Sequence, residues 1–223
     1  MSIAPAGAAD DERIRSISLA KYRRHAAGYD RTCGPTWPIR ERAVAALGLQ
    51  PGMRVLDVGC GTGLSLPLLR QAVGDEGLVW GVEHSVDMGA RALERIAHHG
   101  WTNVHLVPEA AQRLVLPEPV DAVLFHYTHD IVRSRATVRH LLSLARPGAA
   151  VAVAGVKYFD GWLSPLNLWV YFKNAAYNGI GGELRTPWDI VAAEVPGLKV
   201  EPTQFGMGYL ATGRLPRAGR QAR

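Results

Sequence analysis

The 223-residue sequence has few cysteines and no long apolar run. Its two cysteines, Cys33 and Cys60, are too few for a disulfide framework and lack the spacing of a metal site. No segment approaches the roughly 20 consecutive apolar residues that cross a bilayer. An alanine-rich start leads directly into Asp10-Asp11-Glu12, without the apolar core of a signal peptide. We therefore expect a cytoplasmic protein with reduced thiols and no bound metal.

The body of the chain also has no strong excess of positive or negative charge. The formal net charge is +5, but much of the excess of lysine and arginine falls in the terminal segments 13–24 and 214–223. No dense basic run with interleaved aromatic residues lies between them, so we expect no nucleic-acid partner. A hydrophobic content of 48% with 20% charged residues is typical of a folded globular protein.

Composition predicts a single domain over residues 13–215, preceded by a leader over 1–12 and followed by a basic tail over 216–223. Within the domain we expect N-terminal helices over 13–50 and an aromatic cap insertion over 156–187. Between these segments, short apolar runs alternate with helical spacing. This rhythm is typical of an α/β fold with a doubly wound, mostly parallel sheet.

The expected strands and helices follow from that alternation. The strands span residues 54–58, 78–82, 104–107, 120–125 and 149–153, with a closing pair at 200–205 and 209–213. The helices span residues 64–73, 86–98, 136–144 and 187–195. Ser85 is the expected N-cap of the second helix, and Thr186 that of the last, with Pro187 in its first position.

The first expected strand contains Asp57 and runs into a glycine-rich turn, Gly59-Cys60-Gly61-Thr62-Gly63. Glycines allow a sharp turn and a close approach of a ligand to the main chain. In a doubly wound sheet, ligands bind at the carboxyl ends of the strands. The G-x-G-x-G spacing differs from the G-x-G-x-x-G of dinucleotide sites, and no P-loop is present. A tight turn without a ligand is the alternative, which the three glycines and Asp57 disfavour.

Glu83 ends the second expected strand, about 20 residues after the glycine turn. A carboxylate at this position can accept hydrogen bonds from both hydroxyls of a ribose, and it disfavours a 2′-phosphate. A solvated loop glutamate is the alternative. Together with the glycine turn, Glu83 predicts a ligand that contains a ribose.

Several of these segments resemble class I S-adenosylmethionine-dependent methyltransferases. Val55 to Gly63, and then Gly81 to Ser85 with Met88, resemble the family's first two motifs. Asp121 to Phe125 resembles its fourth-strand motif, and Arg146-Pro147-Gly148 the turn before strand five. The resemblance implies a Rossmann-like, seven-stranded sheet with an antiparallel final hairpin, and S-adenosylmethionine as the cofactor.

The resemblance also implies which residues contact the cofactor. They are Asp57, Gly59, Cys60, Gly61, Gly63, Glu83, His84, Met88, Glu109, Ala110 and His126. Glu109 stands where the family has an aspartate that contacts the adenine amino group. A narrower resemblance, in Tyr22 to Asp30 and Gly61 to Pro67, is to bacterial phosphatidylethanolamine N-methyltransferases and quinone C-methyltransferases. It implies that Tyr22 and Tyr29 lie by the methionine part of the cofactor, with helix packing as the alternative.

The fourth expected strand ends in His126-Tyr127-Thr128-His129-Asp130, nearest the reacting methyl group in the implied fold. Methyl transfer depends on alignment and exclusion of water, and needs a base only where the nucleophile carries a proton. A neutral histidine suits that role, and Asp130 could orient it. We therefore expect His129, His126 and Tyr127 at the catalytic position. For His126, packing under the cofactor is the alternative.

The aromatic segment begins at Lys157 and includes Trp162 and Trp169. Its apolar positions run nearly all round a helix, which predicts a lid with these three residues in the substrate pocket. A structural cap, a dimer interface and a membrane-surface helix are the alternatives.

The sequence thus predicts methyl transfer to an O, N or C nucleophile of a small, fairly apolar or lipid-like substrate. Phospholipid N-methylation at a membrane surface is a second hypothesis. A non-methylating protein that uses S-adenosylmethionine structurally is a third. Peripheral membrane contact and a homodimer stay open, and the sequence does not identify the methyl acceptor.

Overall fold

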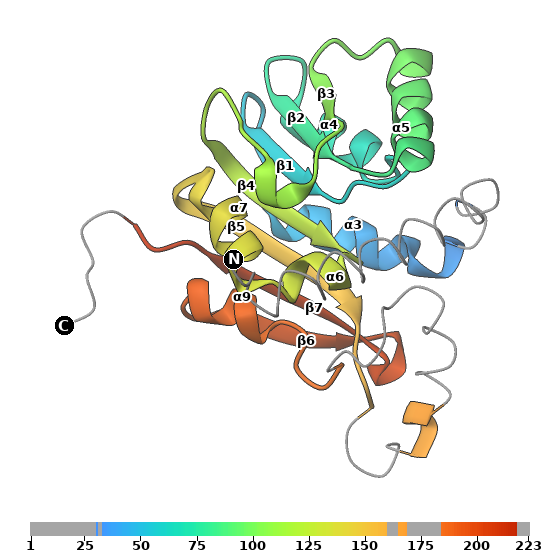
Figure 1. Cartoon of the computed structure of the whole chain (residues 1–223), viewed down its shortest axis with the longest axis vertical. Helices are drawn as coiled ribbons and strands as arrows, with labels where there is room; N and C mark the ends of the chain where they lie inside the picture. Colours follow the sequence, from blue (N-terminus) through green and yellow to red (C-terminus); the bar gives the residue numbers. More distant parts are fainter. Residues whose placement is uncertain (1–29, 31–32, 160–164, 169–183, 218–223) are drawn as a thin grey trace, which may run out of the picture.

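The computed structural model describes residues 30, 33–159, 165–168 and 184–217. Its strands form one seven-stranded sheet in the order β3-β2-β1-β4-β5-β7-β6 (Figure 1). They are β1 (Arg54–Val58), β2 (Leu78–Val82), β3 (Val104–Val107), β4 (Val120–His126), β5 (Ala145–Val156), β6 (Lys199–Thr203) and β7 (Gly208–Arg214). Strands β1 to β5 pair in parallel, whereas β7 is antiparallel to both β5 and β6. The predicted fold and its final hairpin are confirmed.

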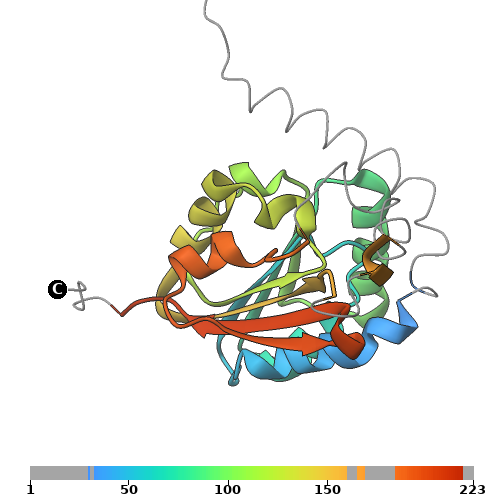
Figure 2. The same cartoon turned by 90° about the horizontal axis from the view of Figure 1, so that it is seen from below.

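Helices cover both faces of the sheet. One face carries α3 (Trp37–Ala46), α4 (Leu66–Val73) and α5 (Val86–His99), and the other carries α6 (His129–Val132), α7 (Arg135–Ser143) and α9 (Asp189–Glu194). Figure 2 shows this layering, with α3 in blue below the sheet and α9 in orange above it. Short 3-10 turns stand at η1 (Gly34–Thr36), η2 (Ala111–Arg113) and η4 (Gln204–Gly206).

Alternation along the strands decides which core each residue joins, because successive side chains point to opposite faces. In β1, Leu56 and Val58 join the core beside α7 and α9, whereas Val55 joins the core beside α3 and α4. On β5, the buried residues of the α3 face are all small: Ala150, Ala152 and Ala154. Their small side chains let α3 pack close to the sheet, which brings α3 near the ends of β1 and β4.

The expected boundaries hold closely in the first half of the sheet, where β1, β2 and β3 begin and end as predicted. Ser85 is the N-cap of α5, and its Oγ accepts the Met88 N–H at 3.5 Å. The last helix is different, because Trp188 is its N-cap and not Thr186. The Thr186 hydroxyl donates to the Asp189 carboxylate, and a turn precedes the helix, so Pro187 stays outside it.

Four predicted site residues, Tyr22, Tyr29, Trp162 and Trp169, lie outside the described residues. Within the described part, no helix has the length and apolarity needed to cross a membrane. The same part contains no group of three or more His, Cys, Asp and Glu side chains that could hold a metal ion. Neither Cys33 nor Cys60 forms a disulfide.

Candidate functional site

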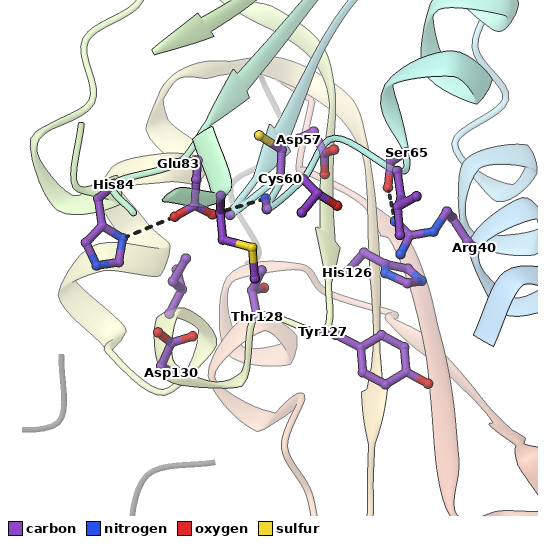
Figure 3. Close-up of a pocket in the computed structure, with 16 residues that line it drawn as sticks. Arg40, Asp57, Cys60, Ser65, Glu83, His84, His126, Tyr127, Thr128 and Asp130 are labelled. Atoms are coloured by element: carbon purple, nitrogen blue, oxygen red, sulfur yellow. Dashed lines mark hydrogen bonds and ion pairs between the residues drawn. The ribbon is translucent and has the colours of Figure 1, made fainter. Parts of the chain in front are cut away.

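A cavity opens at the carboxyl ends of β1, β2 and β4, beside the switch point between β1 and β4 (Figure 3). Together with its open mouth it contains about 660 Å³ of space. Its walls are formed by Arg40, Asp57, Gly59, Cys60, Gly61, Thr62, Leu64, Ser65, Glu83, His84, Met88, His126, Tyr127, Thr128, Asp130 and Ile131.

The glycine turn forms the floor of this cavity. Gly59 and Gly61 have left-handed φ angles of 60° and 58°. A Cβ on Gly61 would meet nothing within 4 Å, so this glycine opens directly onto the cavity. Gly63 does not line the cavity, because it faces α4 and α5; a Cβ there would lie 2.7 Å from Leu66 Cδ1. The structure therefore gives the third glycine a packing role, and its predicted contact with the cofactor stays a prediction.

Glu83 is held rigidly at the end of β2. Its Oε2 accepts the Gly61 N–H at 3.0 Å, and its Oε1 accepts the Ser85 N–H at 2.7 Å. Burial raises the pKa of this carboxyl, against the opposing effect of these N–H groups and of His84. Because two backbone donors fix its direction, the carboxylate is well placed to receive a ribose.

Asp57 and Arg40 meet because both lie on the α3 face of the sheet. In β1, Asp57 has the same orientation as Val55, and Arg40 lies on the buried side of α3 with Ala43 and Val44. Arg40 Nη1 donates to Ser65 Oγ at 2.5 Å, which ties α3 to the start of α4. Burial raises the pKa of Asp57 to about 7, although the nearby Arg40 guanidinium lowers it.

The polar atoms of the cavity fit a cationic, nucleoside-type ligand. Four of the buried side-chain atoms that have no hydrogen-bond partner in the described structure line it: Asp57 Oδ2, His84 Nε2, His126 Nε2 and Thr128 Oγ1. Three carboxyl groups border the cavity against one guanidinium, a balance that favours a positively charged ligand. A ribose-bearing molecule with a sulfonium and an ammonium group would match these carboxyl groups and unpaired polar atoms.

His126 and Tyr127 form the opposite wall of the cavity. Burial above all, and then Arg40, hold the pKa of His126 well below its usual value, so the ring is neutral. Tyr127 has a left-handed φ of 59°, and its hydroxyl donates to Gln204 Oε1 at 3.3 Å. Burial raises the pKa of Tyr127 to about 12, so its phenol stays protonated.

His129 has a different position from the one expected of a base. Its Nε2 accepts the Val156 N–H at 3.1 Å, and it does not line the cavity. Burial lowers the pKa of this ring to about 4. Its one basic nitrogen is engaged by the Val156 N–H, so this geometry does not favour His129 as a base, and its catalytic role stays a prediction.

Lys157 is buried, and its Nζ donates to the Tyr158 carbonyl at 3.1 Å. It does not line this cavity, so its role in the substrate pocket stays a prediction. The remaining predicted contacts separate into two groups. His84 and Met88 line the cavity, whereas Glu109 and Ala110 do not.

Two charged residues near the site were not identified from the sequence. Arg40 could have been found, because it shares the apolar side of a helix. Asp30 binds the glycine turn from outside: its Oδ1 accepts the Thr62 hydroxyl at 2.6 Å, and its Oδ2 pairs with Arg95 Nη2 at 2.8 Å. No pattern in the sequence around Asp30 indicates these two contacts.

Residues 55–148 match the model of a family described as a methyltransferase domain. A demethylmenaquinone methyltransferase of Geobacillus kaustophilus is 33% identical over 104 residues, which cover 47% of this chain and 40% of the relative. A phosphatidylethanolamine N-methyltransferase of Cereibacter sphaeroides is 33% identical over 141 residues, covering 62% of this chain and 66% of the relative. The chain spans about half the length of the first curated relatives it matches.

Solved structures share the fold. The N-methyltransferase NodS from Bradyrhizobium japonicum, determined with S-adenosyl-L-homocysteine, superposes with a TM-score of 0.66 at 15% identity. The superposition covers 90% of this chain and 99% of that protein.

Proposed function

We propose that this chain, whose residues 55–148 match the model of a methyltransferase domain, uses S-adenosylmethionine to methylate an O, N or C nucleophile of a small, fairly apolar molecule. The observation that carries the proposal is the single cavity that joins the glycine turn, Glu83 and the His126–Tyr127 wall. One part of this cavity fits the cofactor, and the other leaves polar groups for an acceptor.

The residues around the glycine turn hold the cofactor in this proposal. Glu83 receives the ribose hydroxyls, and the open backbone at Gly61 allows close approach. Asp57 and Arg40 together face the amino and carboxylate groups of the methionine part. When bound, S-adenosylmethionine supplies an electrophilic methyl group on its sulfonium.

His126 orients the acceptor. Its Nε2 is buried, neutral and without a hydrogen-bond partner in the described structure, so it can accept a hydrogen bond from a hydroxyl or amine. Where the nucleophile carries a proton, the same nitrogen can take it during transfer. Because the His126 ring is buried, little water competes at this nitrogen, which strengthens both contacts.

A lipid acceptor is the second candidate. Leu166, Leu168 and Phe205 expose large apolar side chains, 48%, 65% and 101% of their reference area. A relative of this chain is named as a phosphatidylethanolamine N-methyltransferase. For both candidates, a cytoplasmic location is part of the proposal.

The first test is calorimetric binding of S-adenosylhomocysteine, with NAD as the control. We expect saturable binding of the former only; no binding would overturn the cofactor assignment. Acceptors are then screened by release of S-adenosylhomocysteine, with naphthoquinols, phenols and phosphatidylethanolamine vesicles in parallel. His126→Gln should lower turnover on the accepted class without weakening S-adenosylhomocysteine binding.

A further inference from the structure

A second cavity adjoins the first beyond Glu83. It contains about 1170 Å³ including its opening, and it shares His84, Asp130 and Ile131 with the first cavity. Its other walls are Ala110, Ala111, Gln112, Arg133, Ser134, Ala136 and Thr137. Ala110, predicted to contact the cofactor, therefore lines this space.

The position of Glu83 decides what enters the second cavity. With the ribose on Glu83, the sulfonium end of the cofactor would extend toward Asp57 and His126, which line the first cavity. The adenine would then lie on the opposite side, past His84, which borders both cavities. Its exocyclic amine donates hydrogen bonds and requires an acceptor there.

Glu109, which the sequence predicts as that acceptor, is already engaged elsewhere. Its Oε1 accepts the Ala110 N–H at 2.6 Å and two Arg113 donors at 2.9 and 2.7 Å. These bonds hold the pKa of Glu109 below its usual value, and the side chain lines neither cavity. The backbone N–H of Ala110 is occupied by the same carboxylate.

Asp130 is the only carboxyl group lining the second cavity among the residues the structure describes. It stands at the start of α6, on the boundary of the two cavities, close enough to influence both Glu83 and His84 electrostatically. Figure 3 shows its carboxylate in the space below His84. Burial raises the pKa of the Asp130 carboxyl, and the Asp130 and Ile131 N–H groups and His84 oppose this effect. A carboxylate can accept about four hydrogen bonds.

We propose that Asp130 accepts a hydrogen bond from the exocyclic amine of the cofactor and thereby selects adenine. The proposal rests on the cofactor site described above. Glu109 keeps its bonds to Arg113 and Ala110 and takes no part in this selection.

The test is calorimetry with two ligands, S-adenosylhomocysteine and S-inosylhomocysteine, which carries a carbonyl oxygen in place of the amine. The wild type should bind the adenine compound about tenfold more tightly, as expected for one buried hydrogen bond. In Asp130→Asn this preference should vanish or reverse, since the amide can donate to the carbonyl. Asp130→Ser keeps an acceptor for the local backbone and should also lose most of the preference, even if the amide variant folds poorly.

Glu109→Gln is the matched control, and it should keep the wild-type preference. A preference that survives both Asp130 substitutions, or that disappears in Glu109→Gln, would overturn the assignment. So would equal affinity of the wild type for both ligands. Failure of the wild type to bind S-adenosylhomocysteine at all would instead refute the proposed function.

Discussion

Left-handed backbone occurs on two sides of the cavity. The turn after β1 uses glycines for it, whereas the turns after β4 and β6 use residues with large side chains. On the cofactor side, Gly59 and Gly61 have φ angles of 60° and 58°. On the acceptor side, Tyr127, Gln204 and Phe205 have φ angles of 59°, 49° and 55°. Glycine adopts this region readily, whereas a residue with a Cβ is penalised by about 1–2 kcal/mol.

The difference shows how each side of the cavity is determined. The glycine turn follows from local sequence, because its residues favour the geometry themselves. The acceptor side depends on contacts between distant segments: Tyr127 N–H donates to the Ala154 carbonyl at 2.8 Å, and its hydroxyl donates to Gln204. Strained residues of this kind cluster at functional sites.

The largest expected effect tests the buried acid on the cofactor side. Because the pKa of Asp57 rises from 3.8 to about 7 on folding, the free energy of unfolding should fall as pH rises from about 4 to about 7. Asp57→Asn should remove this slope and raise the free energy of unfolding of the cofactor-free protein by about 4 kcal/mol at pH 8. Urea unfolding over this pH range measures it; identical slopes in both proteins would contradict the prediction.

The segment after β4 should respond to pH in the opposite direction, through His129. The pKa of His129 falls from 6.5 to about 4 on folding, so the free energy of unfolding should decrease as pH is lowered through this range. His129→Gln keeps an acceptor for the Val156 N–H but does not titrate. It should remove about 3 kcal/mol of the acid destabilisation, and the difference between the two urea-unfolding profiles reports it.

Two glycine substitutions should separate stability from binding on the cofactor side. A Cβ on Gly59 would lie 2.7 Å from Thr128 Cγ2, whereas one on Gly61 projects into open space. Gly59→Ala should therefore lower the free energy of unfolding by about 2 kcal/mol more than Gly61→Ala. Gly61→Ala should instead show the greater loss of S-adenosylhomocysteine affinity relative to its loss of stability. Equal effects of the two variants on both measurements would be inconsistent with the geometry.

The smallest effect concerns Phe205, whose backbone has a left-handed φ of 55°. Its side chain is fully exposed, so no burial of this side chain offsets the backbone penalty. Phe205→Gly should raise the free energy of unfolding by about 1 kcal/mol, because it relieves the backbone penalty. Phe205→Ala keeps that penalty and serves as the control. If both variants are equally stable, the left-handed backbone at Phe205 carries no penalty and the prediction is wrong.

Sequence patterns predicted the sheet well because apolar runs bounded by turn residues leave little choice of strand limits. They also brought Asp57, Glu83 and His126 together, since parallel strands end at one edge. The limits came from contacts between distant segments. Nothing in the sequence shows that the Val156 N–H occupies His129. Arg40 and Gln204 enter the site from a helix and a hairpin outside the recognisable motifs.

The strand order also sets a sequence of assembly. β7 lies inside the sheet between β5 and β6, although it is the last strand in the described part of the chain. During synthesis, β1, α4 and β2 emerge well before residues 199–214, and β5 keeps an unpaired edge until the hairpin arrives. Gln204 reaches Tyr127 only at that point. The cofactor half of the cavity can thus form on a nascent chain whose acceptor half is still incomplete.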